Sequence, residues 1–288
     1  MLYIICNPTA GNGRAKKICQ DTLAYLQNKN IEFEHVYTKG PGDATVLAQK
    51  AAERDFETVL SVGGDGTAYE VACGLNGSTT ALGIIPAGTG NDFIKTLGYP
   101  KDPVKALEFI LAHSPKPTDT GLMNDRLFLN EIGTGFDALA LNYASKMKKF
   151  CKGLLPYLLG VICALFRYKP LELTYQIDDL PAVTMKALVC GVANGRIIGG
   201  GIPIAPEASV EDGLFDVIIV RYIPHWRIFP YLPKLLAGKV LQFPETIFCR
   251  AKSVTFSSPD MIVNIDGELQ NMDTVSLKIS EGTLLVHR

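Results

Sequence analysis

A glycine-rich loop, Gly63-Gly64-Asp65-Gly66-Thr67, follows the apolar run 58–62 and is the sharpest chemical signal in the sequence. Paired glycines let backbone N–H groups approach phosphate oxygens without a Cβ in the way. The helix expected to start near Thr67 adds the positive end of its dipole. Asp65 is a carboxylate at a site otherwise suited to anions, which makes sense if it holds a magnesium ion that bridges phosphates. Taken alone, the loop could also be a tight strand-to-helix turn with a capping Asp.

Two further loops have the same character. Pro86-Ala87-Gly88-Thr89-Gly90-Asn91-Asp92-Phe93 places glycines, a hydroxyl and a carboxylate after another apolar run, and Asn7-Pro8-Thr9-Ala10-Gly11 follows the first run of the chain. Neither of the two standard phosphate motifs explains them. The sequence has no GxxxxGK[ST], and the GxGxxG fingerprint fails because Lys16 stands where its last glycine should be.

Up to residue 115, apolar runs alternate with helical patterns. Strand candidates fall at 2–6, 33–37, 58–62 and 81–85, and helix candidates at 15–28, 43–54, 67–75 and 102–113. Strands that alternate with helices indicate a doubly wound α/β layer. In such a sheet ligands bind beyond the carboxyl ends of the strands, and all three glycine-bearing loops follow strands on that edge.

Beyond Pro115-Lys116-Pro117, alternating runs typical of an antiparallel β domain dominate. The runs fall at 126–131, 171–177, 184–193, 214–220, 253–256, 261–265, 274–279 and 283–287, and two helical segments, 136–166 and 225–237, interrupt them. The sequence therefore predicts a doubly wound α/β domain at 1–118 and a mostly antiparallel β domain at 119–288. The last strand is a candidate to return to the first domain.

The composition is that of a globular protein with an ample core. Of the 288 residues 47% are apolar and 20% are charged, and the net charge is −1. This balance lacks the basic footprint of a nucleic-acid binder, so we expect no nucleic-acid partner. Seven cysteines without a CxxC pair, and a start without a secretory signal, favour a reducing cytoplasm. The longest apolar stretch, 153–166, is shorter than the roughly twenty residues that a membrane span needs.

Taken together, NPTAG at 7–11, GGDGT at 63–67 and PAGTGNDF at 86–93 resemble the catalytic family of the diacylglycerol kinases. This family includes bacterial soluble diacylglycerol kinases and the related sphingosine and ceramide kinases. The resemblance continues through the second half in the family's order. Its later motifs are Asn194-Gly195-Arg196, Gly199-Gly200-Gly201, Ile204-Ala205-Pro206, EDGLFDV at 211–217 and Asp266-Gly267-Glu268. The resemblance therefore spans nearly the whole chain.

The resemblance implies an N-terminal nucleotide domain, a C-terminal β-sandwich and an active site in the cleft between them. The residues that would hold ATP are Asn7, Pro8, Thr9, Ala10, Gly11, Thr38, Gly63, Gly64, Asp65, Gly66, Thr67, Gly88, Thr89, Asn91 and Asp92. The acceptor hydroxyl must lose its proton as it attacks the γ-phosphate, and a carboxylate within hydrogen-bond reach suits that task. By resemblance the base is Glu268, with Asp266 beside it and Asp65 completing the catalytic set. The sequence leaves the roles of Asp266 and Glu268 unseparated, and Asp-Gly is also a common hairpin turn.

Bacterial members of the family further imply a structural magnesium ion at the Asp212-Gly213-Leu214 turn. Mapped onto this sequence, its ligands would be Ser209, Asp212 and Leu214, with Asp216 as an alternative or outer member. Hard cations accept backbone carbonyl oxygens, so this set of ligands is chemically sound. On local grounds a plain hairpin is the alternative interpretation.

A lipid kinase has to draw its substrate from a bilayer, and one segment has a composition suited to that contact. Basic residues at 146–152 precede the apolar run 154–166, and Arg167-Tyr168-Lys169 follows it. Basic flanks on an apolar helix suit docking on an anionic membrane surface, and 225–231 could help. Two helices that cover the core, with solvated ends, are an equal alternative. We expect a cytoplasmic protein with peripheral, reversible attachment to the inner face of the membrane.

The sequence thus predicts transfer of the γ-phosphoryl group of ATP, with Mg²⁺, to a lipid hydroxyl, with diacylglycerol as the favoured acceptor. An NAD kinase is the nearest enzymatic alternative, because it shares the chain length, the GGDGT loop and a β domain. A non-catalytic nucleotide- or lipid-binding protein of this fold is the third, although Asp65, Asp92 and Glu268 are all present. The acyl chains, the head group and the oligomeric state stay open, and an exposed sheet edge would allow a homodimer.

Overall fold

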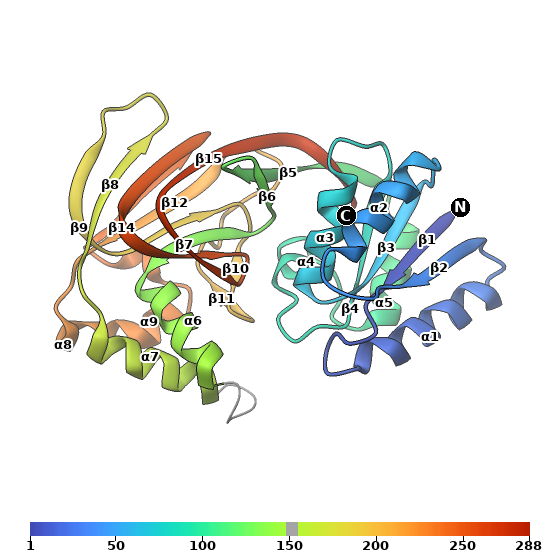
Figure 1. Ribbon diagram of the computed structural model, residues 1–288, viewed down its shortest axis with the longest axis horizontal. Coiled ribbons are helices and arrows are strands. Elements are labelled where there is room, and N and C mark those ends of the chain that lie inside the picture. The colour runs from blue at the N-terminus through green and yellow to red at the C-terminus, as the bar shows by residue number, and fades with distance from the viewer. Residues whose placement is uncertain (148–154) are drawn as a thin grey trace. The chain divides into compact units, whose positions relative to one another are not determined.

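The computed structural model describes residues 1–147 and 155–288. The chain divides into two compact units (Figure 1). The first contains Met1–Thr120 and Ser280–Arg288, and the second contains Gly121–Ile279. The final strand therefore begins in the second unit and contributes its last residues to the first.

The first unit is built on parallel strands in the order β4-β3-β1-β2. The strands are β1 (Leu2–Cys6), β2 (Phe33–Tyr37), β3 (Thr58–Gly63) and β4 (Ala81–Pro86). Every residue of β1, β3 and β4 is buried, as expected for parallel strands covered on both faces. Val286, near the end of the chain, pairs in parallel with Leu82 of β4.

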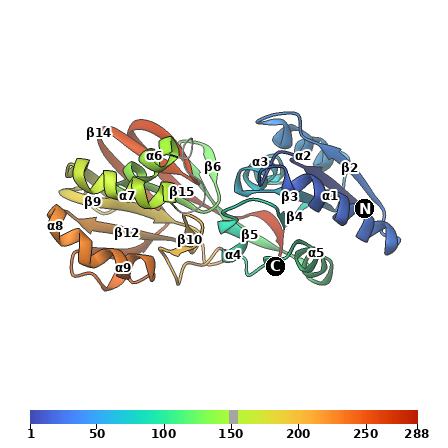
Figure 2. The ribbon, with the colours of Figure 1, turned by 90° about the horizontal axis from the view of Figure 1, so that it is seen from below.

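Helices cover both faces of this sheet, and they are α1 (Arg14–Asn28), α2 (Asp43–Glu53), α3 (Asp65–Leu75), α4 (Asp92–Thr96) and α5 (Pro103–Ala112). Helices α2 and α3 pack together, and α1 packs with α5 on the other side of the sheet (Figures 1 and 2). The start of α5 shows how the sequence sets such a boundary. Asp102 accepts the amides of Val104 and Lys105, both at 3.0 Å, and Pro103 occupies the first helical position.

The second unit is a mostly antiparallel β structure. Its strands are β5 (Pro115–Met123), β6 (Arg126–Phe128), β7 (Glu131–Gly135), β8 (Leu171–Ile177), β9 (Val183–Ala193), β10 (Ile197–Ile198), β11 (Ile202–Pro203), β12 (Phe215–Arg221), β13 (Thr246–Ala251), β14 (Ser253–Ile265) and β15 (Glu268–His287). Strands β7 and β8 each pair with both β9 and β14, but with different parts of them. Because β9 and β14 each pair with both β7 and β8, the strands can enclose an apolar core between two layers.

That core contains Phe128 stacked on Phe215, with ring centroids 5.5 Å apart, and the fully buried Phe256. A second apolar cluster lies under the helices of this unit. These are α6 (Phe136–Met147), α7 (Leu155–Arg167), α8 (His225–Ile228) and α9 (Leu232–Leu236), with short 3-10 turns η1 (Phe229–Tyr231) and η2 (Val240–Gln242). Helices α6 and α7 lie side by side (Figure 2). In the described part of the chain, no helix is long and apolar enough to cross a membrane.

The predicted fold class is confirmed, an α/β unit joined to a β-rich unit, but several predicted elements are wrong. The run 126–131 is not one strand, because it breaks at Leu129-Asn130, where backbone amides turn away to meet Asp266. The segments expected at 253–256 and 261–265 are one strand with a register shift, and 274–279 and 283–287 are also one strand. Strands β5 and β13 and helix α4 were not predicted. Part of the predicted membrane segment, 148–154, lies outside the described residues.

Candidate active site

The three glycine-bearing loops begin where three neighbouring parallel strands end. The loop after β1 is fixed to β3, because the Asn7 amide donates to the Val62 carbonyl at 3.0 Å. The end of β2 joins the same edge, where the Thr38 amide donates to the Cys6 carbonyl at 2.9 Å. Parallel strands end at a common edge, so loops distant in sequence become neighbours there.

The Asn7 side chain ties the first loop to the GGDGT loop. Its amide nitrogen donates to the Thr67 hydroxyl at 3.1 Å, and its oxygen accepts the backbone amide and the hydroxyl of Thr9. Within the same loop, the Ala10 amide donates to the Asn7 carbonyl. Thr67 is buried, so this contact locks the first turn of α3 to the end of β1.

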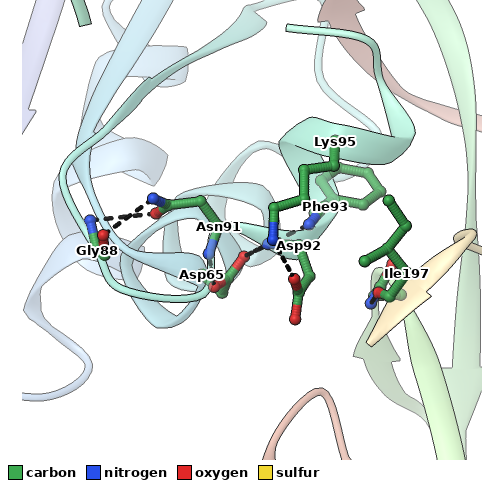
Figure 3. A network of polar contacts seen from close by, with 8 residues as sticks. Asp65, Gly88, Asn91, Asp92, Phe93, Lys95 and Ile197 are labelled. Atoms are coloured by element: carbon green, nitrogen blue, oxygen red, sulfur yellow. Dashed lines mark hydrogen bonds and ion pairs between the residues drawn. The ribbon is translucent and has the colours of Figure 1, made fainter. Parts of the chain in front are cut away.

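Asp65 joins the GGDGT loop to the loop after β4 (Figure 3). One of its oxygens accepts the Asn91 amide at 2.6 Å, and the other accepts the amides of Asp92 and Phe93 at 2.7 and 3.4 Å. The carboxylate therefore caps α4 across 26 residues of sequence, which the sequence did not predict. Its predicted role toward magnesium stays a prediction, and the oxygen that accepts only the Asn91 amide keeps a second lone pair that could bind a cation.

The electrostatic environment of Asp65 favours a cation. Burial raises its pKa above the ordinary value, and the Asp92 carboxylate raises it further, while the amides of 91–93 oppose both effects. Asp92 itself pairs with Lys95, with 2.8 Å between Oδ1 and Nζ. Asp65 and Asp92 repel each other at an edge that also presents many backbone donors. A divalent cation bound between phosphates and these carboxylates would reduce that repulsion.

Several of the glycines are required by contact between the loops themselves. A Cβ on Gly64 would lie 3.2 Å from the Gly88 Cα, and one on Gly88 would lie 2.5 Å from the Gly64 Cα. A Cβ on Gly63 would meet the Thr67 hydroxyl at 2.4 Å. Gly66 differs, because it is exposed and a Cβ there would meet no described atom within 4 Å. Packing therefore does not explain Gly66, whereas the approach of a ligand would.

Sequence reasoning overlooked Arg14. Its guanidinium, at the start of α1, donates to the Gly88 carbonyl at 3.1 Å, and the Asn91 side chain bonds both the amide and the carbonyl of Gly88. Arg14 and Asn91 also line a cavity of about 350 Å³ beside the N-terminus of α5. The position of Arg14 directly after Gly11-Asn12-Gly13 was the sequence feature that could have pointed to it. Thr89, by contrast, is exposed at the tip of its loop.

In the second unit, the Asp266-Gly267-Glu268 turn closes the hairpin of β14 and β15. Ile265 pairs with Glu268, and Asp266 and Gly267 both have positive φ, 48° and 95°. This is the hairpin geometry that Asp-Gly favours. The turn is therefore a hairpin, and any catalytic role would be additional to that.

The structure separates Asp266 from Glu268. The Asp266 carboxylate accepts the amides of Leu129, Asn130 and Glu131 at 2.7, 2.9 and 2.8 Å, so it anchors the start of β7. The Glu268 side chain is 64% exposed and bonds Arg126 through Oε2 at 2.8 Å. Of the two carboxylates, Glu268 is the more exposed, and Asp266 is the one engaged by backbone amides.

The Asn194-Gly195-Arg196 motif bonds the carbonyl groups of the same segment, 129–130, whose amides bond Asp266. The Asn194 side chain donates to the Leu129 carbonyl at 2.7 Å, and the amides of Asn194 and Gly195 donate to the Asn130 carbonyl. Asn130 in turn donates to the Ile197 carbonyl at 2.6 Å. The motif thus serves to hold the segment that Asp266 also holds.

The turn predicted to hold a structural magnesium ion fits one only in part. The Asp212 Oδ1 accepts the Leu214 amide at 3.2 Å, Ser209 accepts the Glu211 amide, and Arg250 lies 3.7 Å from the other Asp212 oxygen. Arg250 already supplies a positive charge, and no cluster of three His, Cys, Asp or Glu side chains that could hold a metal occurs within 1–147 and 155–288. One oxygen of the buried Asp216 has no hydrogen-bond partner among the described residues. This ligand set stays a prediction.

An α/β unit with glycine-rich loops at its carboxyl edge, joined to a β-sandwich unit, defines a fold, and a fold alone does not define a function. Residues 1–123 match the model of the diacylglycerol kinase catalytic domain, and 130–288 match that of the YegS C-terminal NAD kinase beta sandwich-like domain. A diacylglycerol kinase from Bacillus subtilis (strain 168) is 32% identical over 275 residues, which cover 93% of this chain and 90% of that protein. The chain belongs to the diacylglycerol kinase family and is a lipid kinase-type transferase.

Further proteins are similar to this chain in sequence or in fold. A diacylglycerol kinase from Mycobacterium tuberculosis (strain ATCC 25618 / H37Rv) is 28% identical over 92% of this chain and 87% of that protein. A solved diacylglycerol kinase structure from Bacillus anthracis str. Sterne covers 99% of this chain and 96% of its own, with TM-score 0.75 and 24% identity. An NAD kinase from Archaeoglobus fulgidus in complex with ATP shares the fold at TM-score 0.56 and 16% identity, covering 100% and 94%.

Proposed function

We propose that this protein transfers the γ-phosphoryl group of ATP to the hydroxyl of a lipid, with diacylglycerol as the acceptor and phosphatidic acid as the product. Family membership supports a lipid kinase, and the relatives named diacylglycerol kinase support this acceptor. The observation that carries the proposal is the interlocked edge of the first unit. There Asp65, Asn7 and Asn91 hold three loops together and leave Gly66 open to a ligand.

In this proposal the loops bind the phosphates through their backbone. The first N–H groups of a helix have no partner within the helix, so the start of α3 at Asp65-Gly66-Thr67 is suited to an anion. Asn7–Gly11 and Gly88–Asp92 flank it on the same edge, and Thr38 follows β2, the strand next to β1. Magnesium, when bound, neutralises charge on the β- and γ-phosphates, and Asp65 and Asp92 are the carboxylates that would hold it.

The base in this proposal is Glu268. It has to accept the proton of the acceptor hydroxyl as the oxygen attacks phosphorus. Asp266 is already engaged by three backbone amides, so we assign it to positioning the turn. Arg126 holds one oxygen of Glu268 and thereby orients the carboxylate.

A paired substitution tests this assignment. Glu268→Gln should lower the rate of diacylglycerol phosphorylation roughly a hundredfold or more, the size of effect of a lost general base. Its unfolding temperature should not change, because the side chain is exposed. Arg126→Gln is the matched control and should cost less activity than Glu268→Gln. Phosphorylation within threefold of the unaltered rate in Glu268→Gln would contradict the assignment.

We also propose that the protein works in the cytoplasm and attaches reversibly to an anionic membrane to reach its lipid. Basic residues on both sides of the apolar segment that contains α7 support this attachment, because such flanks suit an anionic surface. Flotation with vesicles of phosphatidylglycerol and phosphatidylcholine tests it. Binding should rise with the anionic fraction and fall with salt, and equal recovery with neutral vesicles would contradict it.

A further inference from the structure

Lys95, in the short helix α4, places a basic side chain at the edge where the glycine-bearing loops meet. Its Nζ lies 2.8 Å from Asp92 Oδ1, and the side chains of Lys95 and Asp92 are only 17% and 13% exposed. Figure 3 shows this pair beside Asp65, whose Oδ1 accepts the Asp92 amide at 2.7 Å. Water screens an enclosed ion pair much less than an exposed one, so the charge of Lys95 acts strongly on its surroundings.

The other oxygen of Asp92 faces a space that it shares with Asp65. A Cβ on Gly90 would lie 2.9 Å from Asp65 Oδ2 and 3.7 Å from Asp92 Oδ2, so both oxygens approach the point that a side chain there would fill. Asp65 Oδ2 accepts the Asn91 amide and has a second lone pair. Two carboxylate oxygens that face the same glycine suit a hard cation.

Lys95 changes what this space can hold. Two carboxylates and one ammonium group leave Asp65, Asp92 and Lys95 with a single negative charge between them. A divalent cation alone would turn that charge positive, next to an ammonium group that repels it. A divalent cation that arrives with a polyphosphate brings anionic oxygens, which compensate both the cation and the ammonium group.

We propose that Lys95 is a resident counter-ion of Asp65 and Asp92, which disfavours a divalent cation alone and favours one that enters with the phosphates of a nucleotide. The proposal rests on the proposed binding of ATP and magnesium at this edge, and it adds a residue that couples the two ligands. Lys95 is a positioning residue, because it acts through Asp92 and through its charge and forms no bond with the transferred group.

Removal of the ammonium group has two consequences of opposite sign. The two carboxylates would face their common space without the positive charge of Lys95, so a divalent cation should bind more tightly in the absence of nucleotide. In the absence of metal, the phosphates of ATP would meet the same two carboxylates, so ATP should bind more weakly. Damage to the fold would weaken both ligands, and the opposite signs therefore separate an electrostatic role from a merely structural one.

Lys95→Met tests both consequences on the whole chain. Mn²⁺ is the probe for the cation, and its binding is measured without nucleotide from the electron spin resonance signal of the free ion. We expect Mn²⁺ to bind Lys95→Met roughly tenfold or more tightly than the unaltered protein. ATP binding, measured by calorimetry in EDTA, should be roughly threefold or more weaker. A Mn²⁺ affinity that is unchanged or lower in Lys95→Met, or an ATP affinity that is unchanged or higher, would overturn the proposal.

Two further variants make the test specific to this charge at this place. Lys95→Arg keeps the charge and should return both affinities toward those of the unaltered protein. Lys50→Met removes an exposed lysine from the last turn of α2, which ends before β3 begins and thus at the opposite edge of the sheet. It should change neither affinity. Changes in Lys50→Met as large as those in Lys95→Met would assign the effect to net charge and overturn the proposal.

The proposal also predicts the outcome if Lys95→Met does not fold in EDTA. Mg²⁺ should then restore its folding, because the cation supplies the positive charge that the substitution removed. If Lys95→Met does fold, Mg²⁺ should raise its unfolding temperature more than that of the unaltered protein. Unfolding of Lys95→Met that Mg²⁺ does not reverse, or an equal shift for the two proteins, would count against the counter-ion.

These outcomes are separable from the kinase reaction. Phosphorylation of diacylglycerol by a protein whose Mn²⁺ affinity does not depend on Lys95 would remove this role and leave the proposed function in place. An unaltered protein that binds no ATP in the presence of Mg²⁺ would remove the proposed function, and this role with it.

Discussion

Gly66 offers the cleanest test of whether the GGDGT loop binds a ligand or merely turns the chain. It is exposed, it is the second residue of α3, and a Cβ there would meet no described atom within 4 Å. Alanine is favoured over glycine in a helix by about 1 kcal/mol. Gly66→Ala should therefore leave the free energy of unfolding unchanged or raise it by up to roughly this amount.

The effect on ATP should be opposite in sign. If phosphate oxygens lie at hydrogen-bond distance from the amides at the start of α3, a methyl group at Gly66 stands in their way. We expect ATP affinity to fall at least tenfold, which corresponds to about 1.4 kcal/mol. Calorimetric titration with ATP, together with thermal unfolding in its absence, measures both quantities on the same protein.

Gly63→Ala supplies the contrast. Its Cβ would lie 2.4 Å from the Thr67 hydroxyl inside a buried turn, so overpacking should reduce stability by roughly 1–3 kcal/mol even without ATP. ATP binding by Gly66→Ala as tight as that of the unaltered protein would refute a ligand role for this glycine. A loss of stability in Gly66→Ala as large as that in Gly63→Ala would also refute it, because the glycine would then be a packing requirement.

Asp65→Asn should lower the free energy of unfolding by roughly 2–4 kcal/mol in urea titration, because it weakens charge-assisted bonds to three backbone amides, and an unchanged midpoint would contradict that role. Asp266→Ala should cost about 3 kcal/mol by leaving the amides of 129–131 without an acceptor, and stability equal to that of Glu268→Gln would refute it. Burial raises the pKa of Asp137, which faces Glu131 of β7 and Cys190 of β9, to about 6. The folded protein then binds the proton more tightly than the unfolded chain, so stability falls as pH rises from about 4 to 6, and Asp137→Asn should be more stable by roughly 3 kcal/mol at pH 7.5 but not at pH 4. Parallel stability curves for the two proteins across that range would rule out this cause.

The doubly wound layer was predictable because its signals are local. Strands β1, β3 and β4 are short, mostly apolar runs, and each is followed by a glycine-bearing turn and a helix, so β1 was predicted with its observed bounds. The placement of the three loops on one edge followed from the parallel arrangement alone. The exposed position of Glu268 in a hairpin also agrees with what Asp-Gly suggests locally.

Contacts between distant residues were not predictable. Asp65 reads as a metal ligand or a cap of its own helix, whereas its partners lie 26–28 residues away, where only the folded loops bring their amides. The break between β6 and β7 depends on Asp266, more than 130 residues later. The closeness of Glu131 and Asp137, which both approach Gly133, was missed because the two acids look like ordinary charges in a strand and a helix. An acid within the apolar run IGTGFDALAL was the one available signal.

The central claim is that the acceptor of the γ-phosphoryl group is a lipid hydroxyl. Incubation with ATP labelled in the γ-phosphate and Mg²⁺, with diacylglycerol in mixed micelles and NAD in the same reaction, tests it in one measurement. We expect the label to appear in phosphatidic acid, NAD to stay unlabelled, and Glu268→Gln to lower the lipid signal roughly a hundredfold or more. Label in NADP, or ATP turnover with no labelled lipid, would contradict it.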